Sequence, residues 1–420
     1  MTCAIKHGFQ TYRKGLYGCL LGMLCVLSFT SIAITPAHAA PEETDMKPAE
    51  ISAATILRVG PTRWLRTPSA AARVARPGDT IEIDAGTYSN DYAEWRQDNL
   101  TIRGVDGMAH LQSNGLIPNG KAIWLISGNN TVVENVEFSG ARVVDTNGAG
   151  IRHEGGNLTL RNTYFHHNEF SVLTGAFPDA SLDVFSSRFH FQKRENTFSH
   201  GIYVGGLGRF TISGSHFTGT DRGHQIKSRA LENHILYNRI EDIEGGTASR
   251  LIDLPNCGLS YVIGNDMAQA ATTENFDAIG YGAEGCESRT PEQRSLFVIN
   301  NTFVNEAIAG ALVRNHVAAD VLVANNLRFG RGYFLIGEGA TEHNIALNLD
   351  ARLPGSWAAP AGSAAIDSAI ALSQTEEGNY LVPTEHFKPP LGTAARPHNN
   401  ALDTGSREYT ENTAAGGALE

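Results

Sequence analysis

The stretch Val133-Glu-Asn135-Val-Glu-Phe138 decides the fold, because variants of it return through the middle of the chain. In each copy a short apolar strand ends in Asn, Gly or Ser, and an apolar or aromatic residue follows two or three positions later. The later copies are Leu160–Phe165, Val184–Phe189, Ile212–Phe217, Leu236–Ile240, Ile263–Met267, Ile299–Phe303 and Val323–Phe329. A spacing of roughly 24 to 28 residues indicates a stacked repeat rather than an ordinary globular domain. The corner Asn residues are interpreted as structural, since their amides can hydrogen-bond along the stack.

A second short strand follows each copy after a loop of variable length. These strands are Gly150–Arg152, Gly201–Val204, Gln225–Ser228, Leu251–Leu254 and Ala311–Arg314. Consecutive parallel strands joined by short turns are typical of a β-helix, because ordinary parallel sheets need helical crossovers. We therefore predict an all-β chain folded as a single-stranded parallel β-helix of roughly ten coils, one strand spacing apart.

The opening coil is expected to include residues 76–88. Residues 76–88 read Arg-Pro-Gly-Asp-Thr-Ile-Glu-Ile-Asp-Ala-Gly-Thr-Tyr, in which a Pro-Gly turn leads into an alternating strand and Gly86 provides the next corner. This stretch resembles the opening coil of right-handed parallel β-helix proteins of the pectate-lyase superfamily, so the resemblance implies a right-handed coil. The preceding segment, Pro68–Arg73, predicts a short helix that shields the open edge of the first coil.

The start of the chain predicts an export signal. Lys6, Arg13 and Lys14 precede a long uncharged stretch that ends in the small-x-small pattern of Pro36-Ala-His-Ala39. We expect a signal peptide over 1–39, a poorly ordered leader over 40–55, the β-helix over 56–350, and an irregular segment over 351–420 that packs on the last coils. An uncleaved membrane anchor is the alternative. The protein is thus expected to be exported, periplasmic or extracellular, monomeric, and without a stable membrane span after cleavage.

The net charge limits the classes of ligand that the chain could bind, and the cysteines allow two redox states. The formal net charge of −11 argues against nucleic acid, whose binding depends on neutralising phosphates. It does not exclude an acidic polysaccharide, because a local basic groove can lie on an acidic protein. Cys257 and Cys286, the two cysteines beyond the signal peptide, lie about one coil apart. Both a disulfide and a pair of free buried thiols remain open.

Three of the second strands align on their inward isoleucines, Ile202, Ile226 and Ile252. Since side chains alternate along a strand, the residues that follow them should form an outward column of Tyr203, Lys227 and Asp253. Further polar residues flank the column, two of them in the loops on either side. These are His200, His224, Arg250, Arg222 and Arg229. One face of three adjacent coils is therefore expected to concentrate charged and titratable groups.

Such a face fits an enzyme that processes uronates. Lyases and epimerases of acidic sugars remove the proton at C5 and need a cation at the neighbouring carboxylate as well as a base. Arginine binds carboxylates bidentately. Lys227 is the candidate base if neighbouring cations and desolvation lower its pKa, and Tyr203 is the candidate donor to the leaving glycosidic oxygen.

The segment Gln225–Ser228, followed by Asn238–Ile240 and Asn265–Met267, resembles the lysine-bearing core of the chondroitinase B and alginate-lyase family. That resemblance implies a lysine base and an arginine acid in the matching strand of the next coil. Here Asp253 stands in that place, and Arg250 lies three positions earlier. Gly223–Arg229, Ile252–Asn256 and Tyr281–Gly285 are more similar to uncharacterised exported β-helix proteins.

Several alternatives stay open beside the leading hypothesis of a polysaccharide lyase or uronate epimerase. Lys227 and Asp253 could form a plain surface ion pair, worth under about 1 kcal/mol, and the two histidines could simply satisfy backbone groups at the corners. That would favour a non-catalytic glycan-binding protein or envelope scaffold. Asp253 and Glu284 could instead serve a glycoside hydrolase. No cofactor and no metal are expected; Ca²⁺, which clustered carboxylates hold in pectate lyase, is the alternative.

Overall fold

The computed structural model describes residues 54–193, 198–242, 246–372, 374–375, 381–397 and 401–410. The predicted signal peptide lies outside the described residues, as does the predicted leader apart from residues 54 and 55. Within the described part of the chain, no helix is long and apolar enough to cross a bilayer.

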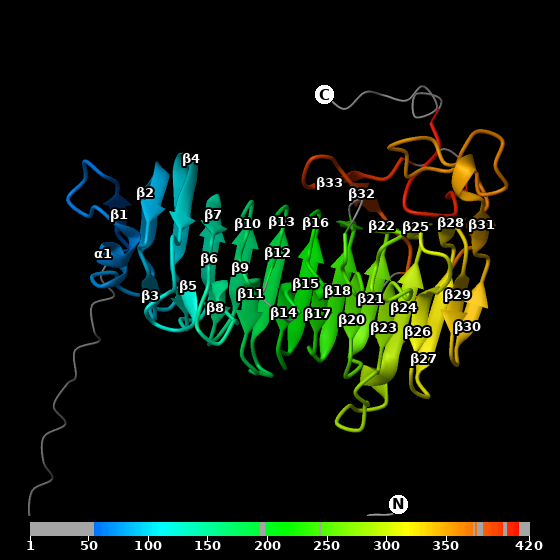
Figure 1. Ribbon diagram of the computed structural model, residues 1–420, viewed down its shortest axis with the longest axis horizontal. Helices are drawn as coiled ribbons and strands as arrows, with labels where there is room; N and C mark the ends of the chain where they lie inside the picture. Colours follow the sequence, from blue (N-terminus) through cyan, green and yellow to red (C-terminus); the bar gives the residue numbers. More distant parts are fainter. Residues whose placement is uncertain are drawn as a thin grey trace, which may run out of the picture. The chain divides into compact units, whose positions relative to one another are not determined.

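Parallel strands dominate the structure and form two sheets that run along the same solenoid (Figure 1). In the first sheet, of 21 strands, most coils contribute one strand before a sharp corner and one after it. The strands before the corner are β1 (Ile56–Val59), β6 (Thr131–Glu134), β9 (Leu158–Arg161), β12 (Ser181–Phe185), β15 (Arg209–Ser213), β18 (Glu232–Leu236), β21 (Leu259–Ile263), β24 (Ser295–Ile299), β27 (Asp320–Ala324) and β30 (Ala340–Glu342).

The strands after the corner are β7 (Val136–Ser139), β10 (Tyr164–His166), β13 (Arg188–His190), β16 (His216–Thr218), β19 (Arg239–Glu241), β22 (Asp266–Gln269), β25 (Thr302–Asn305), β28 (Leu327–Gly330) and β31 (Ile345–Leu347). In two early coils a single long strand continues through the corner, namely β2 (Thr80–Ser89) and β4 (Thr101–Gln112).

The second sheet has 10 strands, each from a different coil. They are β3 (Ala93–Trp95), β5 (Ala122–Ile126), β8 (Ala149–His153), β11 (Phe170–Thr174), β14 (His200–Val204), β17 (His224–Ser228), β20 (Ile252–Leu254), β23 (Ile279–Tyr281), β26 (Ala311–Asn315) and β29 (Tyr333–Ile336). The predicted right-handed parallel β-helix is confirmed, with about eleven turns rather than ten.

The core consists of ladders of like side chains, because consecutive coils pair in register. Ile202, Ile226, Ile252 and Ile279 stack inward from the second sheet. From the first sheet come the rings of Phe138, Phe165, Phe189 and Phe217, whose successive centroids lie 5.0, 5.3 and 4.3 Å apart. All eight side chains are buried. The periodic apolar residues of the sequence are therefore the core of the solenoid.

The corner between the two strands of the first sheet contains two distinct positions that the sequence pattern merges. Asn135 and Asn162 occupy the left-handed backbone region, with φ of 56° and 45°. In later coils Tyr237 and Asn300 take that conformation, and the Asn one residue later points inward. These inward residues form a buried ladder in which each Nδ2 donates to the Oδ1 of the next coil, through Asn238, Asn265, Asn301, Asn326 and Asn344.

A short helix covers the N-terminal end of the solenoid, and a hairpin near the C-terminus packs on a middle coil. The predicted short helix is present as α1 (Pro68–Ala72); Thr67 caps its first turn, and Ala71 and Ala72 are buried against the core. Near the C-terminus, β32 (Glu385–Phe387) and β33 (Thr393–Ala395) form a hairpin. Two short 3₁₀ turns lie earlier in the chain: η1 (Glu292–Arg294) precedes β24, and η2 (Leu349–Ala351) follows β31. The hairpin, labelled β32 and β33 in Figure 1, contacts the corner of a middle coil, where the N–H of Gly392 donates to the carbonyl of Gly214 at 2.7 Å.

Candidate active site

The outward column of the second sheet lies where the strand alternation predicts it. Tyr203 on β14 pairs in register with Lys227 on β17, and Lys227 pairs with Asp253 on β20. The next position along the column is Gly280 on β23. Side chains from three coils are thus brought together on one face, although 50 residues of chain separate Tyr203 from Asp253.

Asp253 is the centre of this group. Its carboxylate lies 3.3 Å from Lys227 Nζ, 3.1 Å from Arg250 Nη1 and 3.5 Å from His224 Nε2. Its side chain is only 3% exposed, and those of its three partners are 13% or 14% exposed. The Lys227–Asp253 pair is therefore largely buried and shares Asp253 with two further partners, so it is not an exposed surface ion pair. Removing one partner would leave an uncompensated buried charge.

Arg250 reaches the column from outside it. A Cβ at Gly280 would lie 2.8 Å from Arg250 Nε, so the guanidinium of Arg250 occupies the space that a side chain at position 280 would fill. The order along the face is therefore Tyr203, Lys227, Asp253 and then a guanidinium. An arginine does lie in this stack, one coil beyond the position that the family resemblance implies for the acid.

A second carboxylate closes the open edge of the group. Glu284 accepts two hydrogen bonds from Arg229, from Nη1 at 2.6 Å and from Nη2 at 2.9 Å, and lies 3.5 Å from Lys227 Nζ. Arg229 Nε also donates to the hydroxyl of Tyr203 at 2.9 Å. The Arg229 guanidinium lowers the pKa of Glu284. Because the Glu284 side chain is 47% exposed, this carboxylate lies where a ligand could replace it.

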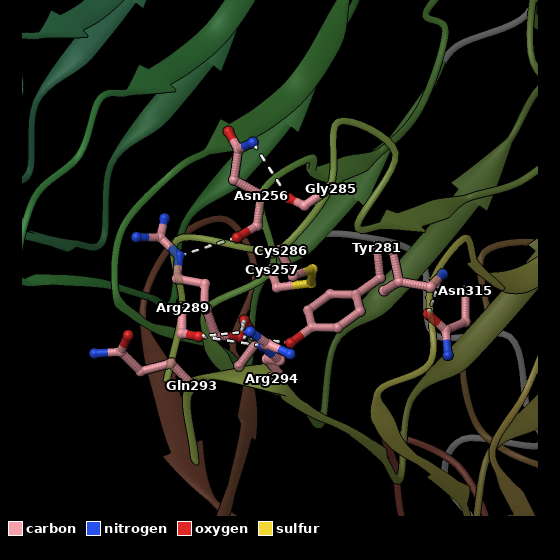
Figure 2. The surroundings of a disulfide bond; sticks show 12 residues. Asn256, Cys257, Tyr281, Gly285, Cys286, Arg289, Gln293, Arg294 and Asn315 are labelled. Atoms are coloured by element: carbon pink, nitrogen blue, oxygen red, sulfur yellow. Dashed lines mark hydrogen bonds between the residues drawn. A yellow bond between two sulfur atoms is a disulfide. The ribbon is translucent and has the colours of Figure 1, made fainter. Parts of the chain in front are cut away.

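We refer to Tyr203, Lys227, Arg229, Arg250, Asp253 and Glu284 as the charged cluster. A disulfide holds the loop that carries Glu284: Cys257 and Cys286 are bonded, with their Cα atoms 5.6 Å apart (Figure 2). Of the two states that the sequence leaves open, the structure has the disulfide. Next to it, Arg289 Nε donates to the carbonyl of Asn256 at 2.9 Å (Figure 2).

Arg289 also ties this loop to the cluster, because its Nη2 donates to the backbone carbonyl of Arg229 at 2.6 Å. Arg229 in turn donates to the side chain of Asn256. The disulfide and Arg289 therefore fix Arg229 and Glu284 relative to each other.

The two histidines satisfy backbone groups at the entrance to the strands. The N–H of His224 donates to His200 Nδ1 at 3.0 Å, and the N–H of Arg250 donates to His224 Nδ1 at 3.1 Å. Burial, together with the charges of Lys227 and Arg250, lowers the pKa of His224 to about 3. His224 is therefore neutral near pH 7, with its Nε2 hydrogen toward Asp253, and is unsuited to act as an acid.

Arg222 pairs with a residue outside the charged cluster: its Nε donates to Glu274 at 2.8 Å. Sequence reasoning missed Asn256, Gly280 and Arg289. Gly280 carries the one signal that could have been read, since a glycine in an outward column leaves room for a neighbouring side chain. The cluster does not fit a calcium site, because its two carboxylates are bound by cations and Ca²⁺ takes six to eight oxygen ligands.

Comparison with solved structures gives distant likenesses of fold. A structure titled pectate lyase Pel9A is 15% identical, with a TM-score of 0.49 over 86% of this chain and 98% of that one. An alginate lyase from Paenibacillus sp. str. FPU-7 is 13% identical, with a TM-score of 0.41 over 70% of this chain and 99% of that one. A pectin methylesterase from Aspergillus niger is 12% identical, with a TM-score of 0.32 over 70% and 85%.

Comparison with curated protein sequences gives no match to this chain. The family model described as a right handed beta helix region matches residues 88–327, which is more than half of the chain and includes the whole charged cluster. The chain therefore belongs to the family of right-handed β-helix proteins.

Proposed function

We propose that this chain is a carbohydrate-active enzyme that binds an acidic polysaccharide over the charged cluster and removes the C5 proton of a uronate, as a lyase or an epimerase. The observation that carries the proposal is the position of Glu284. Arg229 and Lys227 together hold its half-exposed carboxylate at the open edge of the second sheet. A uronate brings the same chemical group, so these two cations form a preorganised carboxylate site.

In the proposed reaction the uronate carboxylate takes the place of Glu284 on Arg229. The bidentate guanidinium then stabilises the negative charge that grows on this carboxylate as the C5–H bond breaks. Lys227 Nζ, beside the same site, accepts the proton. In a lyase, the electron pair forms a C4–C5 double bond while the bond to the glycosidic oxygen breaks.

Tyr203 supplies the leaving oxygen with a hydrogen. Its hydroxyl accepts a hydrogen bond from Arg229 Nε at 2.9 Å, which directs its own hydrogen to another acceptor. Asp253 and Arg250 position Lys227, and Asp253 stabilises the ammonium that forms when Lys227 takes the proton. In an epimerase, the proton returns to the opposite face of C5 and no bond to oxygen breaks.

The hydrolase alternative receives less support from Glu284. Glycoside hydrolysis needs one carboxyl group that is protonated near neutral pH. Arg229 instead lowers the pKa of Glu284, which disfavours Glu284 as that acid. The second candidate is a glycan-binding protein without turnover. It is favoured by the ion pairing of Lys227 with both carboxylates, since a lysine base must first lose its proton.

The test follows the ultraviolet absorbance of the unsaturated product during incubation with a panel of uronate polysaccharides. We expect one substrate to give a rise that falls about 10²- to 10⁴-fold in Lys227→Ala and in Tyr203→Phe, as for loss of an acid or base. Lys121→Ala is the matched control, because Lys121 is an exposed lysine paired with Glu154 on a different coil.

Incubation in heavy water separates the remaining outcomes. Deuterium at C5 without chain cleavage would indicate an epimerase. Binding of an acidic glycan with neither cleavage nor exchange would favour the non-catalytic candidate, and the absence of any binding would overturn both.

A further inference from the structure

A group of metal-ligating side chains lies on the other sheet of the solenoid. His110 on β4, Glu137 on β7 and His166 on β10 come from three consecutive coils of the first sheet, outside the charged cluster. His110 and Glu137 pair in register. On the other side, Glu137 pairs in register with Tyr164, and His166, two residues after Tyr164, reaches Glu137 diagonally. The two imidazoles therefore flank one carboxylate.

The donor atoms already lie near the spacing that a metal ion needs. Glu137 Oε1 is 2.8 Å from His166 Nε2 and 3.6 Å from His110 Nε2, and one ligand atom from each of the three residues lies within 4.8 Å of the others. Four-coordinate zinc with bonds of about 2.1 Å separates its donors by about 3.4 Å. Small side-chain rotations would bring the three atoms into that geometry.

The neighbours of these residues match the surroundings of a metal centre. His166 Nδ1 hydrogen-bonds to His167 Nδ1 at 2.7 Å, which orients the imidazole and leaves Nε2 toward Glu137. Metal-bound histidines characteristically carry such a hydrogen bond on their other nitrogen. The three side chains are 17% to 22% exposed, so the site is shielded but open to a further ligand, such as the nearby hydroxyl of Ser139 or water.

We propose that His110, Glu137 and His166 bind one divalent transition metal of the zinc class. Two imidazoles and a carboxylate select zinc, copper or nickel over Ca²⁺ and Mg²⁺, which prefer oxygen ligands alone. The metal crosslinks β4, β7 and β10, and so stabilises the early coils of the solenoid. This assignment differs from the expectation of a metal-free protein and is independent of the proposed function.

The first experiment titrates Zn²⁺ into the untagged, chelator-treated protein and follows heat release and thermal unfolding. We expect about one equivalent to bind at this site and to raise the unfolding temperature. Because loss of a residue that only supports a metal ligand weakens binding about 10- to 100-fold, we expect about a 100-fold loss or more in His166→Gln and Glu137→Gln.

His216→Gln is the matched control. His216 Nε2 and Glu241 Oε1 form the same kind of pair at 2.8 Å on the same sheet, but within the described residues this pair belongs to no group of three metal ligands. Unchanged zinc affinity in this variant would support the proposal. No saturable binding to the wild type, unchanged affinity in both ligand variants, or equal loss in His216→Gln would overturn it.

Hydrogen exchange locates the metal without relying on a variant that folds. Zinc should slow amide exchange in β4, β7 and β10 of the wild-type protein. Protection confined to other strands would contradict the assignment.

Discussion

The Asn ladder and the charged cluster are built by the same stacking, but they differ in how the sequence uses it. In the ladder, one residue type repeats from Asn238 to Asn344, and each amide satisfies the next coil. In the outward column of the second sheet the residue changes at every coil, from Tyr203 to Lys227, Asp253 and Gly280. In the ladder, the repeated Asn side chains satisfy one another's hydrogen bonds. In the column, the change of residue from coil to coil places oppositely charged side chains next to each other.

Breaking the ladder should have the largest effect on stability. Asn301 is buried; its Nδ2 donates to the Val262 carbonyl and to Asn326 Oδ1, and its Oδ1 accepts from the backbone and side chain of Asn265. We expect Asn301→Ala to lower the free energy of unfolding by about 3 to 5 kcal/mol, since each buried polar group left unpaired costs about 1 to 3 kcal/mol. Denaturant unfolding would measure the change.

Asn348→Ala is the control for this experiment, because Asn348 is an exposed Asn with an extended backbone (φ of −66°) and no capping hydrogen bond from its side chain. Its effect should stay within about 0.5 kcal/mol. Equal effects of the two substitutions would mean that the ladder adds no special stability.

The disulfide tests how firmly the cluster is held. The double variant Cys257→Ser/Cys286→Ser, which leaves no unpaired thiol at the site, should be about 2 to 4 kcal/mol less stable than the wild type. Urea unfolding with and without a reductant would measure this: the reductant should destabilise the wild type and leave the double variant unchanged. Equal stability of the two proteins would show that Arg289 and the coil packing hold the Glu284 loop without the disulfide.

Much of the fold could be predicted from the sequence, because a repeat fixes register by counting. The alignment of Ile202, Ile226 and Ile252 places Tyr203, Lys227 and Asp253 in one column from the strand register alone. Counting failed at the corner, where Asn135 and Asn238 look equivalent in the sequence but occupy left-handed and inward positions one residue apart.

The reach of long side chains could not be predicted in the same way. Arg250 crosses to the space over Gly280, and Arg229 binds Glu284 across 55 residues of chain. Neither contact follows from register, because each depends on rotamers and on a loop of irregular length. The grouping of His110, Glu137 and His166 was missed for a related reason, since His166 reaches Glu137 diagonally and not along the column.

The neutral His224 predicts a pH dependence that the ladder cannot produce. Its pKa of about 3 in the folded protein lies below the value near 6.5 expected in the unfolded chain. Between these two pKa values the unfolded state binds a proton that the folded state does not. The contribution of neutral His224 to stability is therefore fully present above pH 6.5 and is lost as the pH falls toward 3. The contribution of His224 should approach about 1.4 kcal/mol per pH unit within that window.

His224→Gln should therefore flatten the fall in stability between pH 6.5 and 3, whatever its effect at pH 7. The control is His343→Asn, at an exposed corner with φ of 44°, a backbone region that Asn adopts readily. Denaturant unfolding across the pH range measures both slopes. An unchanged slope in His224→Gln would show that other groups carry the acid sensitivity.

The smallest expected effect distinguishes whether Glu284 competes with the substrate or assists it. In the proposed function the uronate carboxylate displaces Glu284 from Arg229, so Glu284→Gln should bind acidic oligosaccharides about two- to fivefold more tightly, as expected for loss of one half-exposed ion pair. Glu274→Gln is the matched control, since its partner Arg222 lies outside the charged cluster. Calorimetric titration of both variants measures the change. Weaker binding in Glu284→Gln than in the control would place Glu284 among the residues that hold the sugar. The charged cluster would then contribute a carboxylate to sugar binding as well as its cations.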